Sequence, residues 1–231
     1  MSFSIKRLMA IFQKDLKDLY RNLYVLSTVL LPLVFAFIYG RMDEVPAEIQ
    51  FFLVSLTLSM VGTFLQCAII AEEKEKNTLR GLMLSPATLP EILAGKSLVT
   101  VVITIVTLLL CIRMAGFNPD HIILVIVGIV LSLIFFLALG TWLGLVTRSV
   151  LEASVYVLPI MMIFGMSNMF IGLKEDYAFL QVLEYTPGLQ LVEIASLTDV
   201  SQSWKPLLII FAWAAGAVIL SVITFRKRSF D

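Results

Sequence analysis

The chain alternates between long apolar stretches and short segments that are rich in charge. Six of the apolar stretches contain no Asp, Glu or Lys and approach the roughly 20 residues that a helix needs to cross a bilayer. They cover residues 24–40, 49–71, 97–115, 122–147, 154–173 and 206–225. The pattern therefore predicts an all-α integral membrane protein with six transmembrane helices.

The composition excludes a water-soluble globular protein. Hydrophobic residues make up 59% of the 231 positions and charged residues only 15%, with a mean hydropathy of +0.96. Soluble domains average about 45–50% apolar and about 25% charged residues. Six spans use most of the apolar residues, so we expect residues 1–231 to form a single transmembrane domain.

The placement of basic residues predicts the orientation of the chain. Its 17 Lys and Arg balance 17 Asp and Glu, so the net charge is zero. An even number of spans puts both termini on one side, and the segments on that side hold most of the Lys and Arg. The opposite side holds Arg41, Arg113, Lys174 and Lys205. Because Lys and Arg accumulate in cytoplasmic segments, we expect both termini to face the cytoplasm.

The first 22 residues have the pattern of an amphipathic helix. Apolar residues recur at helical spacing at Ile5, Leu8, Met9, Phe12, Leu16, Leu19 and Tyr20. Charged residues occupy the other side at Lys6, Lys14, Lys17, Asp18 and Arg21. This pattern predicts a helix over 3–22 that lies in the membrane interface as an anchor. Contact with a cytoplasmic partner is the alternative role.

The segment 72–96 is the one sizeable cytoplasmic loop that this topology predicts. Its charged first part is followed by an apolar stripe, which indicates a short helix that Asn77 or Thr78 caps and that Ser85 and Pro86 end. An exposed apolar stripe favours binding of a soluble partner, and a solvated turn whose leucines enter the headgroups is the alternative. The candidate contact residues are Glu73, Glu75, Asn77, Thr78, Leu79, Arg80, Leu82, Met83, Ser85 and Pro86.

Uncharged polar residues occur within two of the predicted spans. They are Ser55, Ser59, Thr63 and Gln66 at helical spacing in the second span, and Ser167 and Asn168 in the fifth. These side chains either form interhelical hydrogen bonds or line a pathway for a transported molecule. The spacing of Gly140 and Gly144 predicts close packing of two helices.

Several kinds of chemistry find no support in the sequence. The absence of Asp, Glu and Lys from the six spans argues against a transporter driven by protons or sodium. Gly95, Lys96 and Ser97 resemble the end of a phosphate-binding loop, but the first glycine of that motif is replaced by Pro90. We therefore expect no catalytic residue, no metal site and no ATP site on this chain.

The 72–96 segment resembles the corresponding segment of ABC-2 type transporter permeases. The family pattern is a charged run, Gly-Thr-Leu-Glu, a leucine-rich turn, a proline and then Gly-Lys before the third span. This chain has Thr78 and Leu79, Pro86, and Gly95 followed by Lys96. Asn77 stands where the family usually has Gly, and Arg80 stands where it often has Glu. The resemblance extends over the whole chain, from the amphipathic entry helix to the last span.

The resemblance implies the permease fold and the function of an ABC exporter subunit. Two copies would form the pathway in the cell membrane and export a peptide, lipid or drug. A separate ATPase subunit would hold ATP and Mg and dock on the 72–96 loop as its coupling helix. Two short outer helices within 174–205, broken at Pro187 and Gly188, would be re-entrant and would close the exit. The gate residues would be Glu184, Thr186, Pro187 and Gly188.

Two alternatives to these roles remain. The outer segment would simply cap the bundle if it were not a gate. The whole chain would be a membrane sensor or immunity protein, without transport, if the 72–96 loop bound a regulator instead of an ATPase.

Overall fold

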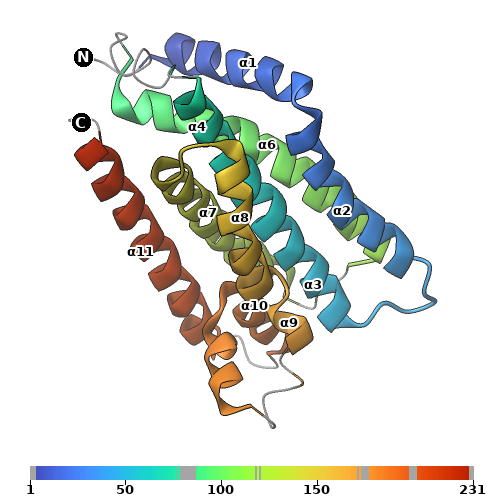
Figure 1. The fold of residues 1–231 in the computed structure, drawn as a ribbon. Coiled ribbons are helices and arrows are strands. Elements are labelled where there is room, and N and C mark those ends of the chain that lie inside the picture. The colour runs from blue at the N-terminus through green and yellow to red at the C-terminus, as the bar shows by residue number, and fades with distance from the viewer. Residues whose placement is uncertain are drawn as a thin grey trace.

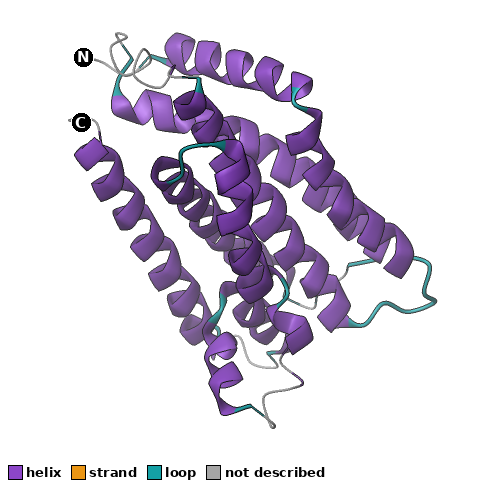
Figure 2. Cartoon of the chain, in the orientation of Figure 1, coloured by secondary structure: helices purple, strands orange, loops and turns teal. Residues whose placement is uncertain are grey.

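The computed structural model is a bundle of helices (Figures 1 and 2). It describes residues 4–76, 78, 87–117, 119, 121–170, 172, 177–197 and 202–228, and it places no strand among them. We call the end at which the described chain starts and finishes the near end, and the opposite end the far end (Figure 1).

Twelve α-helical or π-helical segments and one long 3-10 segment make up the described part of the bundle. The first half consists of α1 (Ile5–Arg21), α2 (Leu23–Tyr39), α3 (Ala47–Thr57), the π-helical η1 (Leu58–Leu65), α4 (Gln66–Glu75) and α6 (Leu89–Ala115). The second half consists of α7 (Ile122–Val146), α8 (Val150–Ile160), the π-helical η2 (Met161–Gly165), α9 (Ser167–Phe170), the 3-10 helix η4 (Ala178–Tyr185), α10 (Pro187–Ser196) and α11 (Trp204–Arg228).

Four helices are long and apolar enough to cross a bilayer by themselves. They are Ala47–Glu75, Glu91–Ala115, Ile122–Val146 and Trp204–Lys227. A fifth span results if α1 and α2 are counted together, although they meet at 83°. Large apolar side chains such as Ile123, Leu30 and Phe211 are more than half exposed on the outer surface, as expected for helices in lipid. The described chain therefore has four to five candidate spans, against the six predicted.

The predicted fifth span differs most from the structure. A continuous helix over 154–173 was expected, whereas the helix begins earlier and ends at Gly165. Ser149 caps its start, because its hydroxyl accepts a hydrogen bond from the Glu152 backbone N–H at 3.2 Å. At the other end Met166 leaves the helical conformation, with φ −112° and ψ 8°. The apolar run alone carries no signal for this break.

The helix formed by α3, η1 and α4 is the centre of the bundle. Its apolar window is 94% buried within the chain, whereas that of α11 is 22% buried. Around it lie α2, α6, α7 and α8, and α11 packs on the outer side of α7 (Figure 1). The predicted second span is thus the element against which the other spans are positioned.

Glycines on α7 permit the closest of these contacts. A Cβ atom on Gly140 would collide with the carbonyl oxygen of Thr63 and would lie 2.9 Å from Cβ of Gln66. A Cβ on Gly144 would lie 2.8 Å from the carbonyl oxygen of Cys67. The small residues four apart therefore bring the two backbones together, as their spacing predicts.

We expect Gly140→Ala to destabilise the protein by about 1–3 kcal/mol, because the added methyl group must push α7 away from the central helix. The measurement is the thermal unfolding midpoint of the purified protein in detergent. Gly216→Ala on α11 is the matched control, since nothing lies within 4 Å of its added Cβ. Equal midpoints for the two variants would contradict the close packing.

Candidate functional site

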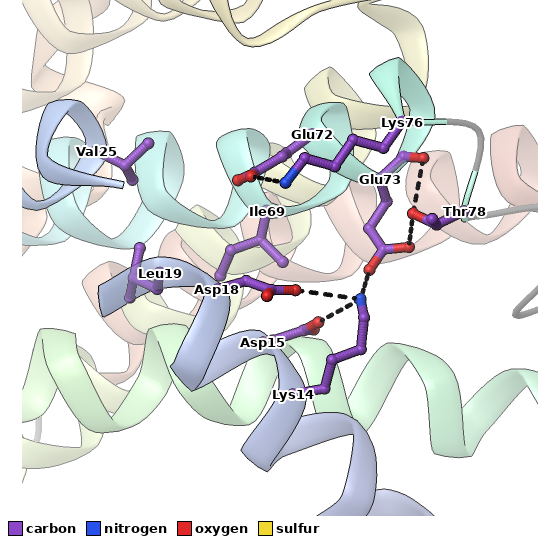
Figure 3. A pocket seen from close by; sticks show the side chains of 10 residues that line it. All are labelled: Lys14, Asp15, Asp18, Leu19, Val25, Ile69, Glu72, Glu73, Lys76 and Thr78. Atoms are coloured by element: carbon purple, nitrogen blue, oxygen red, sulfur yellow. Dashed lines mark hydrogen bonds and ion pairs between the residues drawn. The ribbon is translucent and has the colours of Figure 1, made fainter. Parts of the chain in front are cut away.

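A buried cluster of charged side chains joins α1, α4 and α6 at the near end. Lys96 of α6 is 1% exposed, and its Nζ lies 3.1 Å from Asp15 Oδ2 of α1 and 3.2 Å from Glu73 Oε1 of α4. Lys14 of α1 also pairs with Glu73, and its Nζ lies 3.4 Å from Asp15 Oδ1 (Figure 3). Three separate segments of the chain therefore meet through charge.

The charges of this cluster balance. Two lysines face two buried carboxylates, so each charge that leaves water gains an opposite charge within hydrogen-bonding distance. Burial opposes the charged form of Lys14, but its hydrogen bond to Glu73 and the attraction of Glu73 and Asp15 outweigh burial and raise its pKa above 10.5. Lys14 therefore remains charged at neutral pH, and its stabilising contribution is lost only when the pH rises through this raised pKa.

Gly95 allows α1 to reach the cluster. A Cβ on this residue would lie 2.9 Å from Cβ of Ile11 and 3.1 Å from the carbonyl oxygen of Leu8. The next residue along α6 is Lys96. The Gly-Lys pair of the sequence thus has a physical role here, since the glycine brings two helices into contact and the lysine pairs across that contact.

A second ionic contact fixes the start of α1 to the start of α6. Arg7 Nη2 and Nε lie 2.8 and 3.0 Å from the two carboxylate oxygens of Glu91, which is a bidentate arrangement. Glu91 also accepts a hydrogen bond from the backbone N–H of Thr88 at 2.6 Å and closes a capping box at the start of α6. The hydrogen bond between Arg7 and Glu91 and the attraction of the Glu91 charge raise the pKa of Arg7.

The described residues predicted to contact the ATPase are anchored to the bundle. The hydroxyl of Thr78, three positions after the end of α4, donates a hydrogen bond to Glu73 Oε2 at 2.7 Å and so is tied to the cluster. Glu75 Oε2 accepts a hydrogen bond from the backbone N–H of Val150 at 3.1 Å. A loop was expected over the whole of 72–96, but α4 continues to Glu75 and α6 begins at Leu89. The other candidate residues lie outside the described residues: Asn77, Leu79, Arg80, Leu82, Met83, Ser85 and Pro86.

The ionic cluster of Lys14, Asp15, Glu73 and Lys96 was not predicted from the sequence. The charged residues of the first helix were expected on the side opposite its apolar face at the membrane interface, whereas α1 packs along α6 and places Lys14 against Glu73. One signal was present in the sequence. Asp15 lies four residues after Ile11 and four before Leu19, and all three are buried on one face of α1. A carboxylate in such an apolar row indicates a buried cation, but the sequence does not say which one.

Two of the predicted pathway residues form hydrogen bonds between helices. Gln66 donates to Thr141 Oγ1 at 3.0 Å and accepts from Thr100 Oγ1 at 2.7 Å, which links α4, α6 and α7. Thr63 donates to the carbonyl oxygen of Phe136 at 3.1 Å. Because these polar groups have partners, the geometry favours interhelical bonding at these two positions.

The other predicted pathway residues lie nearer the far end, where α3, η2, α9 and α10 meet. Ser55 and Ser167 are fully buried, and their hydroxyls have no hydrogen-bond partner among the described residues. A Cβ on Gly188 would lie 2.5 Å from Ser55 Oγ and 3.3 Å from Ser167 Oγ, and a Cβ on Gly165 would collide with Ser59 Oγ. Both amide atoms of Asn168 also lack a described partner.

The predicted gate residues lie at the end of η4 and at the start of α10. Glu184 belongs to η4, Thr186 precedes α10, and Pro187 occupies the first turn of α10, where it needs no N–H donor. A break at Pro187 and Gly188 was expected, but both residues are inside α10 and the chain turns at Thr186. Gly188 lies close to Ser55 of the central helix, because a Cβ on it would come within 2.5 Å of Ser55 Oγ.

Comparison with known families gives one finding for this chain. The family model of the ABC-2 type transporter matches residues 6–186, which includes α1, the ionic cluster and the spans up to the start of α10. The search of individual curated proteins finds no match.

We expect Lys96→Met to destabilise the protein by about 3–5 kcal/mol, because it leaves an excess of buried negative charge. Thermal unfolding in detergent measures the effect. Adding Asp15→Asn restores the charge balance, so the double variant should recover part of the loss. Lys76→Met is the matched control, since Lys76 is exposed and pairs with Glu72 on the same helix surface. The cluster has no structural role if Lys96→Met and Lys76→Met unfold at the same temperature.

We expect Ser55→Ala and Ser167→Ala to leave the unfolding midpoint unchanged or to raise it, because each removes a buried hydroxyl without a partner. Thr63→Val is the control, since it removes a made hydrogen bond and should lower stability by about 0.5–1.5 kcal/mol. A loss of stability in Ser55→Ala equal to that in Thr63→Val would contradict the assignment.

Proposed function

The chain belongs to the ABC-2 type transporter family, and on that premise we propose that it is the membrane-spanning permease subunit of an ATP-driven exporter. The family makes it a transport component and a multi-pass membrane protein, and the matched residues include the 72–96 segment. The proposal adds the direction of transport, a dimer of two such chains, and coupling to an ATPase through that segment.

The observation that carries the proposal is the ionic cluster at the base of the 72–96 segment. Glu73 lies near the start of the segment on α4, Lys96 lies at its end on α6, and Asp15 lies on α1. These three elements are linked by charge and by the close contact at Gly95. A force applied to the segment by a partner would therefore move two spans and α1 together.

The orientation follows from the positive-inside rule. In this proposal the near end, with both termini and the 72–96 segment, faces the cytoplasm, where a separate ATPase subunit binds ATP and Mg. The chain itself acts as a permease and carries no catalytic residue. Its location is the cell membrane, as expected for an exporter.

We place the pathway in the half of the bundle near the far end. Ser55, Ser59, Ser167 and Asn168 lie there beneath α10, and three of them hold buried polar atoms without a described partner. Such atoms gain hydrogen bonds when water or a substrate enters, so the observed arrangement supports a closed pathway. Movement of α10 away from Ser55 at Gly188 would open the exit. The family resemblance is the ground for proposing an amphipathic or hydrophobic substrate such as a peptide, lipid or drug.

The π-helical segments support movement in the same region. η1 and η2 contact each other at the middle of the bundle, and Gly165 of η2 faces Ser59 of η1. π-Helical turns are rare and occur frequently at functional sites. We therefore place the hinge of the opening between these two segments.

We expect Leu79→Glu and Leu82→Glu to uncouple the permease from its ATPase, because a charge in the apolar stripe prevents docking. The permease is co-expressed with the ATPase encoded beside it. The first readout is the amount of ATPase that co-purifies, which should fall at least tenfold. Leu151→Glu is the matched control, since this exposed leucine lies at the near end on α8.

A second readout tests transmission to the pathway without knowledge of the substrate. Ser55→Cys is labelled with a membrane-impermeant maleimide, while the native Cys67 and Cys111 are buried. ATP and Mg should change the labelling rate at least threefold in the complex, and this change should disappear with Leu79→Glu. ATP-dependent labelling that survives both leucine variants would contradict coupling through the segment. Capture of a regulator in place of an ATPase would favour the sensor or immunity function.

A further inference from the structure

Helix α1 has three distinct faces, and the ionic cluster uses one of them. Ile11, Asp15 and Leu19 are buried against the bundle. A second face exposes four large apolar side chains. Ile5 is 71% exposed and Tyr20 is 79% exposed, and Met9 and Leu16, which lie between them in the sequence, are also exposed. A third edge exposes Lys6, Lys17 and Arg21. The apolar face and the basic edge together have no covering within the described chain.

The position of α1 brings these faces to the membrane surface. α1 meets α2 at 83°, while α2 runs along the bundle with the spans (Figure 1). A helix nearly perpendicular to the spans lies in the plane of the interface, where its apolar face enters the boundary of the acyl chains. The basic edge adjoins this face, so it lies at the depth of the headgroups.

The basic edge is not neutralised by the protein. No ion pair involves Lys6, Lys17 or Arg21 among the described residues. The acidic residues of α1 point elsewhere, because Asp15 pairs with Lys96 and Asp18 lies 3.6 Å from Lys14. The chain as a whole has no net charge, so this edge is a local positive field.

Lys17 and Arg21 also border a hollow on the surface of α1. Its volume is about 350 Å³, and its lining combines both cations with the amide of Gln13 and the apolar side chains of Leu16 and Tyr20. Lys17 and Arg21 are four residues apart, so they are neighbours on the helix surface. The hollow therefore offers two cations and an amide above an apolar floor.

We propose that this hollow binds the headgroup of an anionic phospholipid. The guanidinium of Arg21 and the ammonium of Lys17 contact the phosphate oxygens, and Gln13 donates a hydrogen bond to an ester or glycerol oxygen. The acyl chains lie along Leu16 and Tyr20. A zwitterionic lipid fits less well, because its own cation faces the basic edge.

The site connects lipid composition to the near end of the bundle. Lys14 and Asp15 precede Lys17 on the same helix and belong to the ionic cluster. A lipid that holds α1 in the interface therefore favours the position in which α1 meets α4 and α6. This consequence rests on the proposed function, whereas lipid binding itself does not.

The test measures lipid binding by the full-length permease alone, without an ATPase. The purified protein in detergent is titrated with phosphatidylglycerol or phosphatidylcholine, and bound lipid is counted by native mass spectrometry. We expect at least fivefold tighter binding of phosphatidylglycerol. Lys17→Gln with Arg21→Gln should abolish this preference, and Arg21→Lys should retain most of it. Lys6→Gln is the matched control, since it lies on the same edge but outside the hollow.

The thermal unfolding midpoint in phosphatidylcholine shows whether the double variant is folded. If it is not folded, the single variants Lys17→Gln and Arg21→Gln each test the site. Equal binding of the two lipids by the unaltered protein would overturn the proposal. So would unchanged phosphatidylglycerol binding in the double variant. Loss of ATPase co-purification when that variant is co-expressed with the ATPase would then show that the edge is a protein contact. The proposed function would survive either result.

Discussion

The buried ammonium group of Lys96 is the constraint on which the near end of this protein depends. A buried lysine is tolerated only when carboxylates meet it, and here they come from two other helices, through Asp15 and Glu73. To satisfy one charge the chain must bring α1 across α6 and extend α4 beyond the apolar run. Gly95 makes the close approach of α1 and α6 possible, and Thr78 donates a hydrogen bond to the carboxylate of Glu73. The geometry of the proposed coupling region is thus a consequence of charge balance.

Buried polar side chains differ in their hydrogen bonding between the two ends of the bundle. At the near end and in the middle, Gln66 and Thr63 have well-placed partners on neighbouring helices. Towards the far end, Ser55 and Ser167 are just as buried but have no described partner. Satisfied polar groups resist separation, whereas unsatisfied ones gain hydrogen bonds when helices part. This difference supports the proposal that the near end receives the force from the ATPase and that the far end opens.

The sequence located most elements because hydrophobic length is a local signal. The stretch 206–225 became α11 at Trp204–Arg228, and 122–147 became α7 at Ile122–Val146. The predicted helix over 154–173 is interrupted at Met166, next to the close contact of Gly165 with Ser59, and apolar content encodes neither feature. The same limit applied to the polar residues. Spacing alone could not separate Gln66, which is fully bonded, from Ser55, which is not.

The sequence by itself determined that this is a helical membrane protein, which segments are apolar, and where its charges concentrate. It also contains the family pattern, including Gly95 and Lys96, because a short motif is made of residues that are close together in the sequence. Only the tertiary structure decided that Lys96 pairs with Asp15, about eighty positions away, and that α10 closes on Ser55 at Gly188. The physical reason is that pairing and close contact depend on how helices approach one another. Hydropathy reports how well each helix fits into lipid, but it does not report which helices pack beside it.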